Sequence, residues 1–231
     1  MISLLYKLVK KRELVFAEGV GTREMLVFMC ARGVWPFLRG IWSYPFLAKM
    51  KGSLFLGRGV VLLYKHKLTI GSGCYIGDYS YINCLSKGGV KLGNGVTLRE
   101  WVWLQLSSGL NNVGEYIEIG DNTYIGPRAI LGAGGPLKIG ANCQIGAGVN
   151  FIAENHVYMG DGAIAEKGVT KLGIEVGEDC WIGNNVIIFD GVRIGRSCVI
   201  GAGSIVTKDV PDFQVAIGSP ARVIKSRIDT A

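Results

Sequence analysis

Branched apolar residues recur at every sixth position over residues 176–211. The first position of each hexad is always Val or Ile: Val176, Ile182, Ile188, Ile194, Ile200 and Val206. The fifth position is small or β-branched: Cys180, Val186, Val192, Cys198, Ser204 and Val210. An amphipathic helix has a period of 3.6 residues, and a glycine every sixth residue would cost a helix about 1 kcal/mol each time. A self-similar hexapeptide instead predicts a parallel β-helix, in which short strands alternate with corners and branched side chains fill the interior.

Less regular hexads extend this pattern back to Leu54, so the β-helix is expected to span residues 52–211. Short insertions interrupt it at residues 87–91 and 108–118, and residues 152–175 leave the pattern altogether. Insertions in a solenoid form surface loops, which is where function tends to reside. A C-terminal cap is expected over residues 212–231.

The N-terminal segment, residues 1–51, has a different composition. Residues 1–15 have the pattern of a short amphipathic basic helix that lacks the features of a secretory signal. Residues 22–48 are apolar and aromatic, but Arg32, Pro36, Arg39 and Pro45 keep every run below the roughly 18 residues of a membrane span. Two interpretations remain open: aromatic and basic residues together favour a membrane–water interface, or the segment packs on the open end of the β-helix.

Charge and cysteine usage narrow the function classes. The net charge is +7, and residues 1–51 hold nine Lys or Arg against three Glu, so the β-helix itself is nearly neutral. No nucleic-acid-binding module accompanies the basic segment, so a nucleic-acid partner is not expected. Cys74, Cys143, Cys180 and Cys198 occupy the small fifth position and are expected to be buried apolar residues, whereas Cys30 and Cys84 lack metal-ligand spacing. A reducing cytosol fits this usage.

The C-terminal hexads resemble a known family. The run Gly201-Ala-Gly-Ser-Ile-Val-Thr-Lys-Asp-Val-Pro211, followed by Gly218-Ser-Pro-Ala-Arg-Val-Ile224, is similar to the ending of the hexapeptide-repeat acyltransferases, among them galactoside, maltose and bacterial polysaccharide O-acetyltransferases. The resemblance covers residues 54–227. It implies an all-β fold, a left-handed parallel β-helix, assembled as a homotrimer with active sites between subunits and acetyl-CoA as cosubstrate.

Of the two histidines, His156 opens the long insertion, whereas His66 lies in a polar patch typical of a solvated surface. Taken alone, His156 could be an ordinary loop residue. The resemblance identifies it as the catalytic base, because the family's catalytic histidine opens such a loop. Neutral imidazole can take the proton of an attacking hydroxyl if its other nitrogen is held by an acceptor. Glu154, Asp161, Glu166 or a backbone carbonyl could supply that acceptor. No Cys or Ser is placed as a nucleophile, so direct transfer without an acyl-enzyme is expected.

The same resemblance assigns the CoA contacts. Phosphates need cations and N–H donors, and the family's positions correspond here to Asn184, Ala202, Thr207, Lys208, Arg222 and Lys225. Asn184 and Ala202 are assigned to the pantetheine arm. The plainer alternative for the cations is ordinary surface charge.

The acceptor is the least specified part. The sugar-binding residues of galactoside and maltose acetyltransferases have no clear match, although Trp101, Trp103 and Tyr124 could stack on a sugar or lie in a trimer interface. We expect acetyl transfer to a sugar hydroxyl in bacterial surface-polysaccharide synthesis, in the cytoplasm or at the inner membrane face, with residues 1–51 touching anionic lipid. The alternatives are N-acetylation of an amino sugar, acetylation of serine or an antibiotic, and a non-enzymatic scaffold. No metal is expected, because the γ-type carbonic anhydrases of this fold need three histidines.

Overall fold

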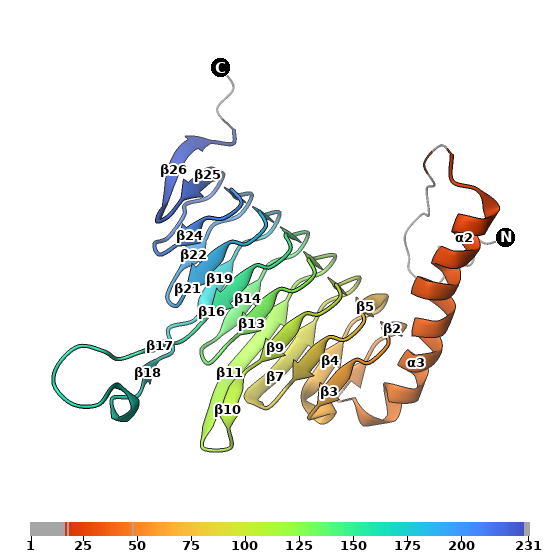
Figure 1. The fold of residues 1–231 in the computed structure, drawn as a ribbon, viewed down its shortest axis with the longest axis horizontal. Helices are drawn as coiled ribbons and strands as arrows, with labels where there is room; N and C mark the ends of the chain where they lie inside the picture. Colours follow the sequence, from red (N-terminus) through yellow and green to blue (C-terminus); the bar gives the residue numbers. More distant parts are fainter. Residues whose placement is uncertain (1–16, 18, 48, 229–231) are drawn as a thin grey trace.

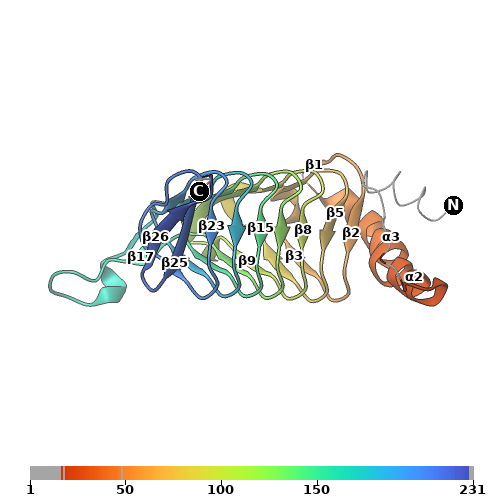
Figure 2. The same ribbon diagram turned by 90° about the horizontal axis from the view of Figure 1, so that it is seen from above.

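The chain folds into a three-sided prism of stacked coils, in which each coil contributes one short strand to each of three parallel sheets (Figures 1 and 2). A computed structural model describes Ala17, residues 19–47 and residues 49–228. The helix expected over residues 1–15 lies outside the described residues.

We name the three sides faces A, B and C. Face A comprises β1 (Lys49–Met50), β4 (Leu68–Ile70), β7 (Ser86–Leu92), β11 (Asn112–Ile119), β14 (Leu137–Ile139), β19 (Ile174–Val176) and β22 (Arg193–Ile194), with β10 (Ser107–Gly109) paired to β11. Face B comprises β2 (Leu54–Leu56), β5 (Cys74–Ile76), β8 (Thr97–Leu98), β12 (Tyr124–Ile125), β15 (Gln144–Ile145), β20 (Trp181–Ile182), β23 (Val199–Ile200), β25 (Gln214–Gly218) and β26 (Ala221–Ser226). Face C comprises β3 (Val61–Leu63), β6 (Tyr81–Asn83), β9 (Trp103–Gln105), β13 (Ile130–Gly132), β16 (Asn150–Ile152), β21 (Ile187–Phe189) and β24 (Ile205–Val206).

The interior follows the hexad prediction. Every first-position and fifth-position residue of the C-terminal hexads is buried, with at most 5% of its surface exposed. The four cysteines at fifth positions are buried among them, as expected. Burial also raises the pKa of the Cys84 thiol to about 12, so this cysteine is a core residue and no nucleophile at neutral pH. Each buried branched side chain contributes about 1.5–3 kcal/mol relative to an exposed one.

The corners explain the glycine and Asx content. A Cβ on Gly183 would stand 2.5 Å from the Ala202 nitrogen of the next coil, so the second hexad position accepts only glycine there. Asn185 then turns the corner with a φ of 56°. Side-chain oxygens of Asp78, Asn94, Asp121, Asn184 and Asp212 accept backbone N–H groups of the neighbouring coil at 2.7–3.0 Å.

Two expected insertions take different forms. Residues 87–91 remain within the sheet as part of β7, and the register shift is absorbed in β11 between Gly114 and Tyr116. Residues 108–113 form the outer part of the β10–β11 hairpin (Figure 1), and residues 114–118 pair with β7 in face A. The first strand begins at Lys49, three residues before the expected start of the β-helix, because the chain joins face A immediately after the helices.

The N-terminal segment comprises α2 (Thr22–Met29), the π-helical turn η1 (Cys30–Val34), α3 (Trp35–Ser43) and the 3₁₀ turn η2 (Tyr44–Phe46), and α3 packs on β2 of the first coil. Arg39 Nε donates to the Leu56 carbonyl at 2.7 Å, and Arg32 pairs with Glu100 at 2.9 Å. Burial would raise the pKa of Glu100, but hydrogen bonds from its own N–H and Arg99, together with Arg32, lower it. The described helical residues therefore dock on the first coils of the prism. No helix among the described residues is long and apolar enough to span a membrane.

At the opposite end, β25 continues face B and β26 folds back on it, so the expected cap is an antiparallel hairpin. Further short elements are η3 (Lys65–Lys67), η4 (Ile164–Glu166) and the strands β17 (Asn155–His156) and β18 (Val169–Thr170).

Two helical glycines provide a matched test of the helix–prism contact. A Cβ on Gly40 would overlap the Leu54 carbonyl, whereas a Cβ on Gly33 meets no atom within 4 Å. We expect Gly40→Ala to lower the free energy of unfolding by about 1–3 kcal/mol, and Gly33→Ala to leave it unchanged or raise it by up to about 1 kcal/mol. Thermal and urea unfolding measure both, and equal effects of the two variants would contradict the docking described here.

Candidate active site

The residues from Ala153 to Gly173 leave the prism at the corner between faces C and A and form its longest projection (Figure 1). β17 and β18 pair as an antiparallel ribbon at its base, with His156 opposite Val169. The Val157 nitrogen donates to the Gly168 carbonyl at 3.1 Å and extends this ribbon outward. The His156 side chain is exposed, so its imidazole stands on the ribbon and in reach of solvent-borne molecules.

Contacts from both neighbouring parts of the prism hold the base of this loop. The Asp190 carboxylate accepts three hydrogen bonds: from Thr170 Oγ1 at 3.0 Å, the Leu172 nitrogen at 3.1 Å and the Gly173 nitrogen at 2.7 Å. On the other side, Lys171 Nζ donates to Asn112 Oδ1 of the β10–β11 hairpin at 2.6 Å. The ribbon carrying His156 is thereby fixed to the prism although its tip is exposed.

Sequence reasoning did not identify these contacts. Asp190 occupies the third position of its hexad, where the repeat pattern does not distinguish it from other polar surface residues. The pairing of β16 with β21 is the signal that locates Asp190. Ile152 pairs with Phe189, so Asp190 lies one coil beyond the base of the loop.

Glu154, the predicted partner of His156, points toward the preceding coil. A Cβ on Gly134 would overlap the Glu154 carboxylate, which places that carboxylate over the Gly134 backbone. Within residues 49–228 no hydrogen bond joins Glu154 to His156, nor do Asp161 or Glu166 bond to that ring. The identity of the orienting group remains a prediction.

The two predicted pantetheine contacts stack on neighbouring coils at the corner between faces B and C. The Gly203 nitrogen donates to the Asn184 carbonyl at 2.8 Å, and Asn184 Oδ1 accepts from the Ala147 nitrogen at 2.8 Å. Ala202 has no side-chain oxygen, so it cannot accept the Asn184 N–H as Asn184 Oδ1 accepts the Ala147 N–H of the coil before. Among the described residues, neither the Asn184 N–H nor the Ala202 N–H has an acceptor. Two backbone donors are thus available on one exposed corner, beside Trp181, whose surface is 59% exposed.

The predicted phosphate contacts lie on the last coils and are all exposed: Thr207, Lys208, Arg222 and Lys225. Thr207 and Lys208 follow β24 at the same corner as the His156 loop, two coils or about 10 Å further along the prism. Arg222 and Lys225 lie on β26, and Arg222 Nη1 donates to the Ala221 carbonyl at 2.9 Å. The five-residue step from Ala202 to Thr207 spans at most about 17 Å. Asn184, Ala202, Thr207 and Lys208 therefore lie at the two corners that bound the C-terminal part of face C, whereas Arg222 and Lys225 lie on the end strand of face B.

The outward residues of faces A and C differ in character. On face A the paired column reads Thr69, Lys91, Glu118, Lys138, Glu175 and Arg193. On face C it reads Val61, Tyr81, Trp103, Ile130, Asn150, Ile187 and Ile205. Face A thus carries charges of alternating sign, and face C is mostly apolar.

The aromatic residues considered for sugar stacking already have partners within the chain. Trp101 stacks on Tyr79 with ring centroids 4.8 Å apart, and Trp103 stacks on Tyr81 at 6.4 Å. The Tyr124 hydroxyl accepts a hydrogen bond from Arg99 at 3.0 Å.

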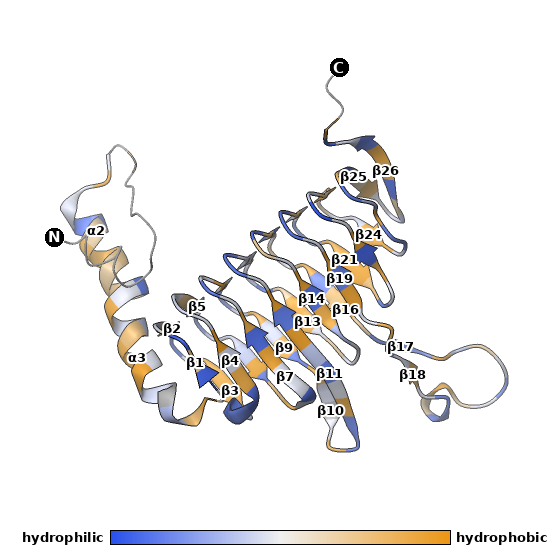
Figure 3. Cartoon of the chain, turned by 180° about the vertical axis from the view of Figure 1, so that it is seen from behind, coloured by the Kyte–Doolittle hydropathy of each residue, from blue (hydrophilic) through white to orange (hydrophobic). Residues whose placement is uncertain are grey.

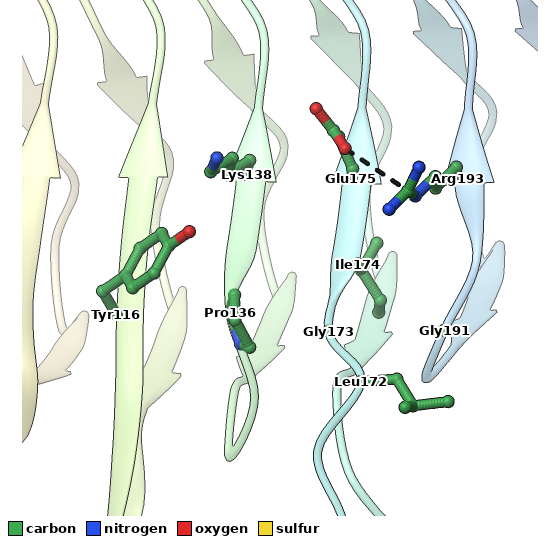
Figure 4. A pocket seen from close by; sticks show the side chains of 9 residues that line it. All are labelled: Tyr116, Pro136, Lys138, Leu172, Gly173, Ile174, Glu175, Gly191 and Arg193. Carbon is green, nitrogen blue, oxygen red and sulfur yellow. Dashed lines mark ion pairs between the residues drawn. The ribbon is translucent and has the colours of Figure 1, made fainter.

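A pocket of about 390 Å³ lies on face A beside the loop base (Figure 4). Tyr116, Lys138 and Arg193 line it, together with Leu172 and Gly173 from the return of the loop. It contains neither His156 nor any predicted CoA contact. Within the described part of the chain, no group of three His, Cys, Asp or Glu residues is placed to hold a metal ion.

Comparisons with known proteins agree with this architecture. The sequence profile of the family described as "Hexapeptide repeat of succinyl-transferase" matches residues 67–99, 116–150 and 172–208, all within the prism. The galactoside O-acetyltransferase of Escherichia coli (strain K12) is 33% identical over 129 residues, which are 48% of this chain and 64% of that protein.

Two solved structures share the fold. The polySia-specific acetyltransferase NeuO aligns with a TM-score of 0.52 and 23% identity, covering 80% of this chain and 85% of its own. The hexapeptide-repeat acetyltransferase VCA0836 of Vibrio cholerae O1 biovar eltor, solved with acetyl coenzyme A, aligns with a TM-score of 0.50 and 20% identity over 97% and 98% of the two chains. The predicted left-handed parallel β-helix is confirmed.

The protein is therefore a left-handed β-helix built from hexapeptide repeats. The matched repeats and the similarity to O-acetyltransferases support the hexapeptide-repeat acetyltransferase family. The chain spans 52% and 64% of the length of two curated relatives that it matches.

The Asp190 clamp can be tested against an equivalent carboxylate elsewhere. Asp190→Ala removes three hydrogen bonds from the loop base, so we expect tryptic cleavage after Lys167 and Lys171 to become about tenfold faster under native conditions. Asp121→Ala removes a similar bond, to the Asn94 nitrogen at 2.7 Å, from a corner remote from the loop and serves as control. Unchanged cleavage in Asp190→Ala, or equal acceleration in both variants, would show that Asp190 does not hold the loop.

Proposed function

We propose that this protein transfers the acetyl group of acetyl-CoA to a hydroxyl of a sugar, with His156 as the general base. One observation carries the proposal most directly. His156 stands on a loop clamped at the same prism corner that bears Thr207 and Lys208. A base and a set of donors suited to CoA thus flank one end of face C, in a chain whose relatives include a galactoside O-acetyltransferase.

The reaction needs one proton acceptor and one site for developing negative charge. One imidazole nitrogen of His156 takes the proton of the sugar hydroxyl as its oxygen attacks the thioester carbonyl carbon. The resulting tetrahedral oxyanion collapses, the carbon–sulfur bond breaks, and the imidazolium returns its proton to the leaving CoA thiolate. Backbone N–H groups facing the oxyanion supply further stabilisation. The cysteines at fifth hexad positions and Cys84 are buried, which fits direct transfer without a covalent enzyme intermediate.

The donor is held by the set described above. The free N–H groups of Asn184 and Ala202 suit the amide carbonyls of the pantetheine arm. Lys208, Arg222 and Lys225 supply cations for the phosphates. The acetyl-CoA complex of the Vibrio cholerae relative supports this choice of cosubstrate.

The assembly completes the site. We propose a homotrimer in which a neighbouring subunit covers the mostly apolar outward column of face C. Outward apolar side chains on so many successive coils are unusual on an isolated soluble protein. The exposed His156 and the face C donors would then border a cleft between subunits.

For the acceptor, we propose a sugar of a bacterial surface polysaccharide, modified in the cytoplasm on a lipid-linked precursor at the inner membrane face. The names of the similar proteins, galactoside O-acetyltransferase and polySia-specific acetyltransferase, support a carbohydrate acceptor. The apolar, basic N-terminal segment supports the location.

His156→Ala should lower acetyl transfer to a sugar panel by about 10²–10⁴-fold, because general-base catalysis supplies that factor. His66→Ala, at the other histidine of the chain, should leave the rate unchanged and is the matched control. Release of CoA thiol and product mass measure the reaction. Undiminished turnover in His156→Ala with intact assembly would refute the assignment.

Lys208→Ala and Arg222→Ala should each weaken CoA binding by about tenfold, since each removes one exposed charge-assisted contact to phosphate. Lys91→Ala and Arg193→Ala remove cations from face A and should not affect binding. Calorimetry with CoA and with dephospho-CoA identifies the cation that meets the 3′-phosphate, because its variant loses less affinity for the shorter ligand. Equal losses from the face A variants would indicate non-specific charge attraction instead.

A further inference from the structure

The helices at the N-terminal end of the prism expose many of their large apolar side chains to solvent. Their outward side carries large exposed apolar residues: Leu26, Val27, Val34, Trp35, Leu38, Ile41, Trp42 and Phe46. Trp42 is 83% exposed and Val27 is 68% exposed. Figure 3 shows α2 and α3 as a largely hydrophobic rod at the end of the prism.

The side of these helices that faces the prism carries one large apolar side chain, Phe37, whose ring centroid lies 5.7 Å from that of Phe55, and is otherwise small or polar. Pro36 and Gly40 are buried, and Gly40 meets the Leu54 backbone. Arg32 and Arg39 also turn inward, where they bind Glu100 and the Leu56 carbonyl. The helix cations that would ordinarily face water are thus used to hold the helices on the prism, and the apolar side is left outward.

Helical spacing groups the outward residues at the end of η1 and on α3 on one side. Val34, Leu38 and Ile41 follow each other by four and three residues, which keeps them on one side of the helix. Trp35 and Trp42 lie beside them. Leu26 and Val27 lie on α2, before the π-helical turn η1, and are also exposed. We name this surface, residues 26–46 on the outward side of α2 to η2, the apolar strip.

Cations border the apolar strip. Arg23 at the start of α2 and Lys49 and Lys51 directly after η2 are exposed, and none forms an ion pair with another described residue. Counted over the sequence, residues 1–51 hold nine Lys or Arg against three Glu. In a two-fold symmetric contact between two copies the same surface meets itself, so these cations would repel the same cations of the other copy. An anionic partner is favoured instead.

We propose that the apolar strip docks this protein on the surface of an anionic lipid bilayer. Trp and Phe side chains are enriched at membrane–water interfaces, where their rings lie at the level of the headgroups. A helix with an apolar face and flanking Lys or Arg lies in the interface plane and is held by burial of that face and by attraction to anionic lipid. The docking surface rests on the proposed membrane location, whereas the transfer chemistry does not depend on it.

The test is co-flotation of the full-length chain with vesicles of phosphatidylcholine alone and of phosphatidylcholine mixed equally with phosphatidylglycerol. The wild-type chain should bind the mixed vesicles more tightly, and the difference should shrink as salt is raised. Trp35→Ser combined with Trp42→Ser should lower partitioning by about tenfold or more. Lys49→Gln combined with Lys51→Gln should lower binding to the mixed vesicles by about tenfold and leave binding to neutral vesicles unchanged.

The control removes exposed apolar residues elsewhere. Leu110→Ser combined with Leu172→Ser acts at side chains that are 80% and 75% exposed on the hairpin and loop, and should bind vesicles like the wild type. Equal binding by the double-tryptophan variant would overturn the proposal, as would equal losses in the control. If that variant instead changes the oligomeric state in sedimentation while the wild type ignores vesicles, the strip is an interface between copies. If removal of residues 1–16 makes Trp42 more accessible to acrylamide in the absence of lipid, the chain's own N-terminus covers the strip.

The two proposals fail independently. The double-tryptophan variant should retain wild-type acetyl transfer to a soluble sugar, and His156→Ala should retain wild-type vesicle binding. Both Trp35 and Trp42 are exposed, so unchanged thermal unfolding of the variant excludes misfolding as the cause of a lost interaction.

Discussion

The spacing between neighbouring coils is the constraint on which the rest of this structure depends. Backbone hydrogen bonds of three parallel sheets hold successive coils about 4.8 Å apart. At that spacing a corner has room for a glycine and for an Asx side chain that accepts the next coil's N–H, as Asn184 does for Ala147. Buried Val and Ile then fill the interior in columns. Composition, repeat length and core are consequences of this single distance.

The same constraint decides where additional chain can go. A strand between two corners cannot lengthen by one residue without turning its inward side chains outward. Extra residues therefore leave at a corner unless a neighbouring strand shifts to match them, as β11 does for β7. Both the β10–β11 hairpin and the His156 loop leave between faces C and A. Because the two excursions share a corner, Lys171 of one can reach Asn112 of the other. A rigid scaffold thus gives a flexible connection a defined base.

The sequence was informative where a residue's role depends on register alone. The interior columns, the isolated position of His156 and the outward Trp181 follow from counting hexads. It was less informative where a role depends on which coil lies beside which. Asp190 looks like any turn residue until the alignment of Ile152 with Phe189 brings it to the loop base. Residues 87–91 seemed to interrupt the repeat, yet β7 absorbs them because the compensating shift lies in β11, far along the chain. The inward use of Arg32 and Arg39 likewise depends on contacts with the first coils.

The three faces and the N-terminal end of the prism divide its surface by chemistry. Face A carries alternating charges that pair across coils, such as Lys91 with Glu118 at 2.6 Å, and these exposed pairs contribute little to stability but keep that side hydrated. Face C presents apolar side chains bordered by unpaired backbone donors and cations, a combination suited to a neighbouring subunit and an anionic cosubstrate. The helices at the N-terminal end present tryptophans bordered by lysines. Since the prism core is complete without these outward apolar residues, their burial elsewhere is the physical reason to expect partners on two separate surfaces.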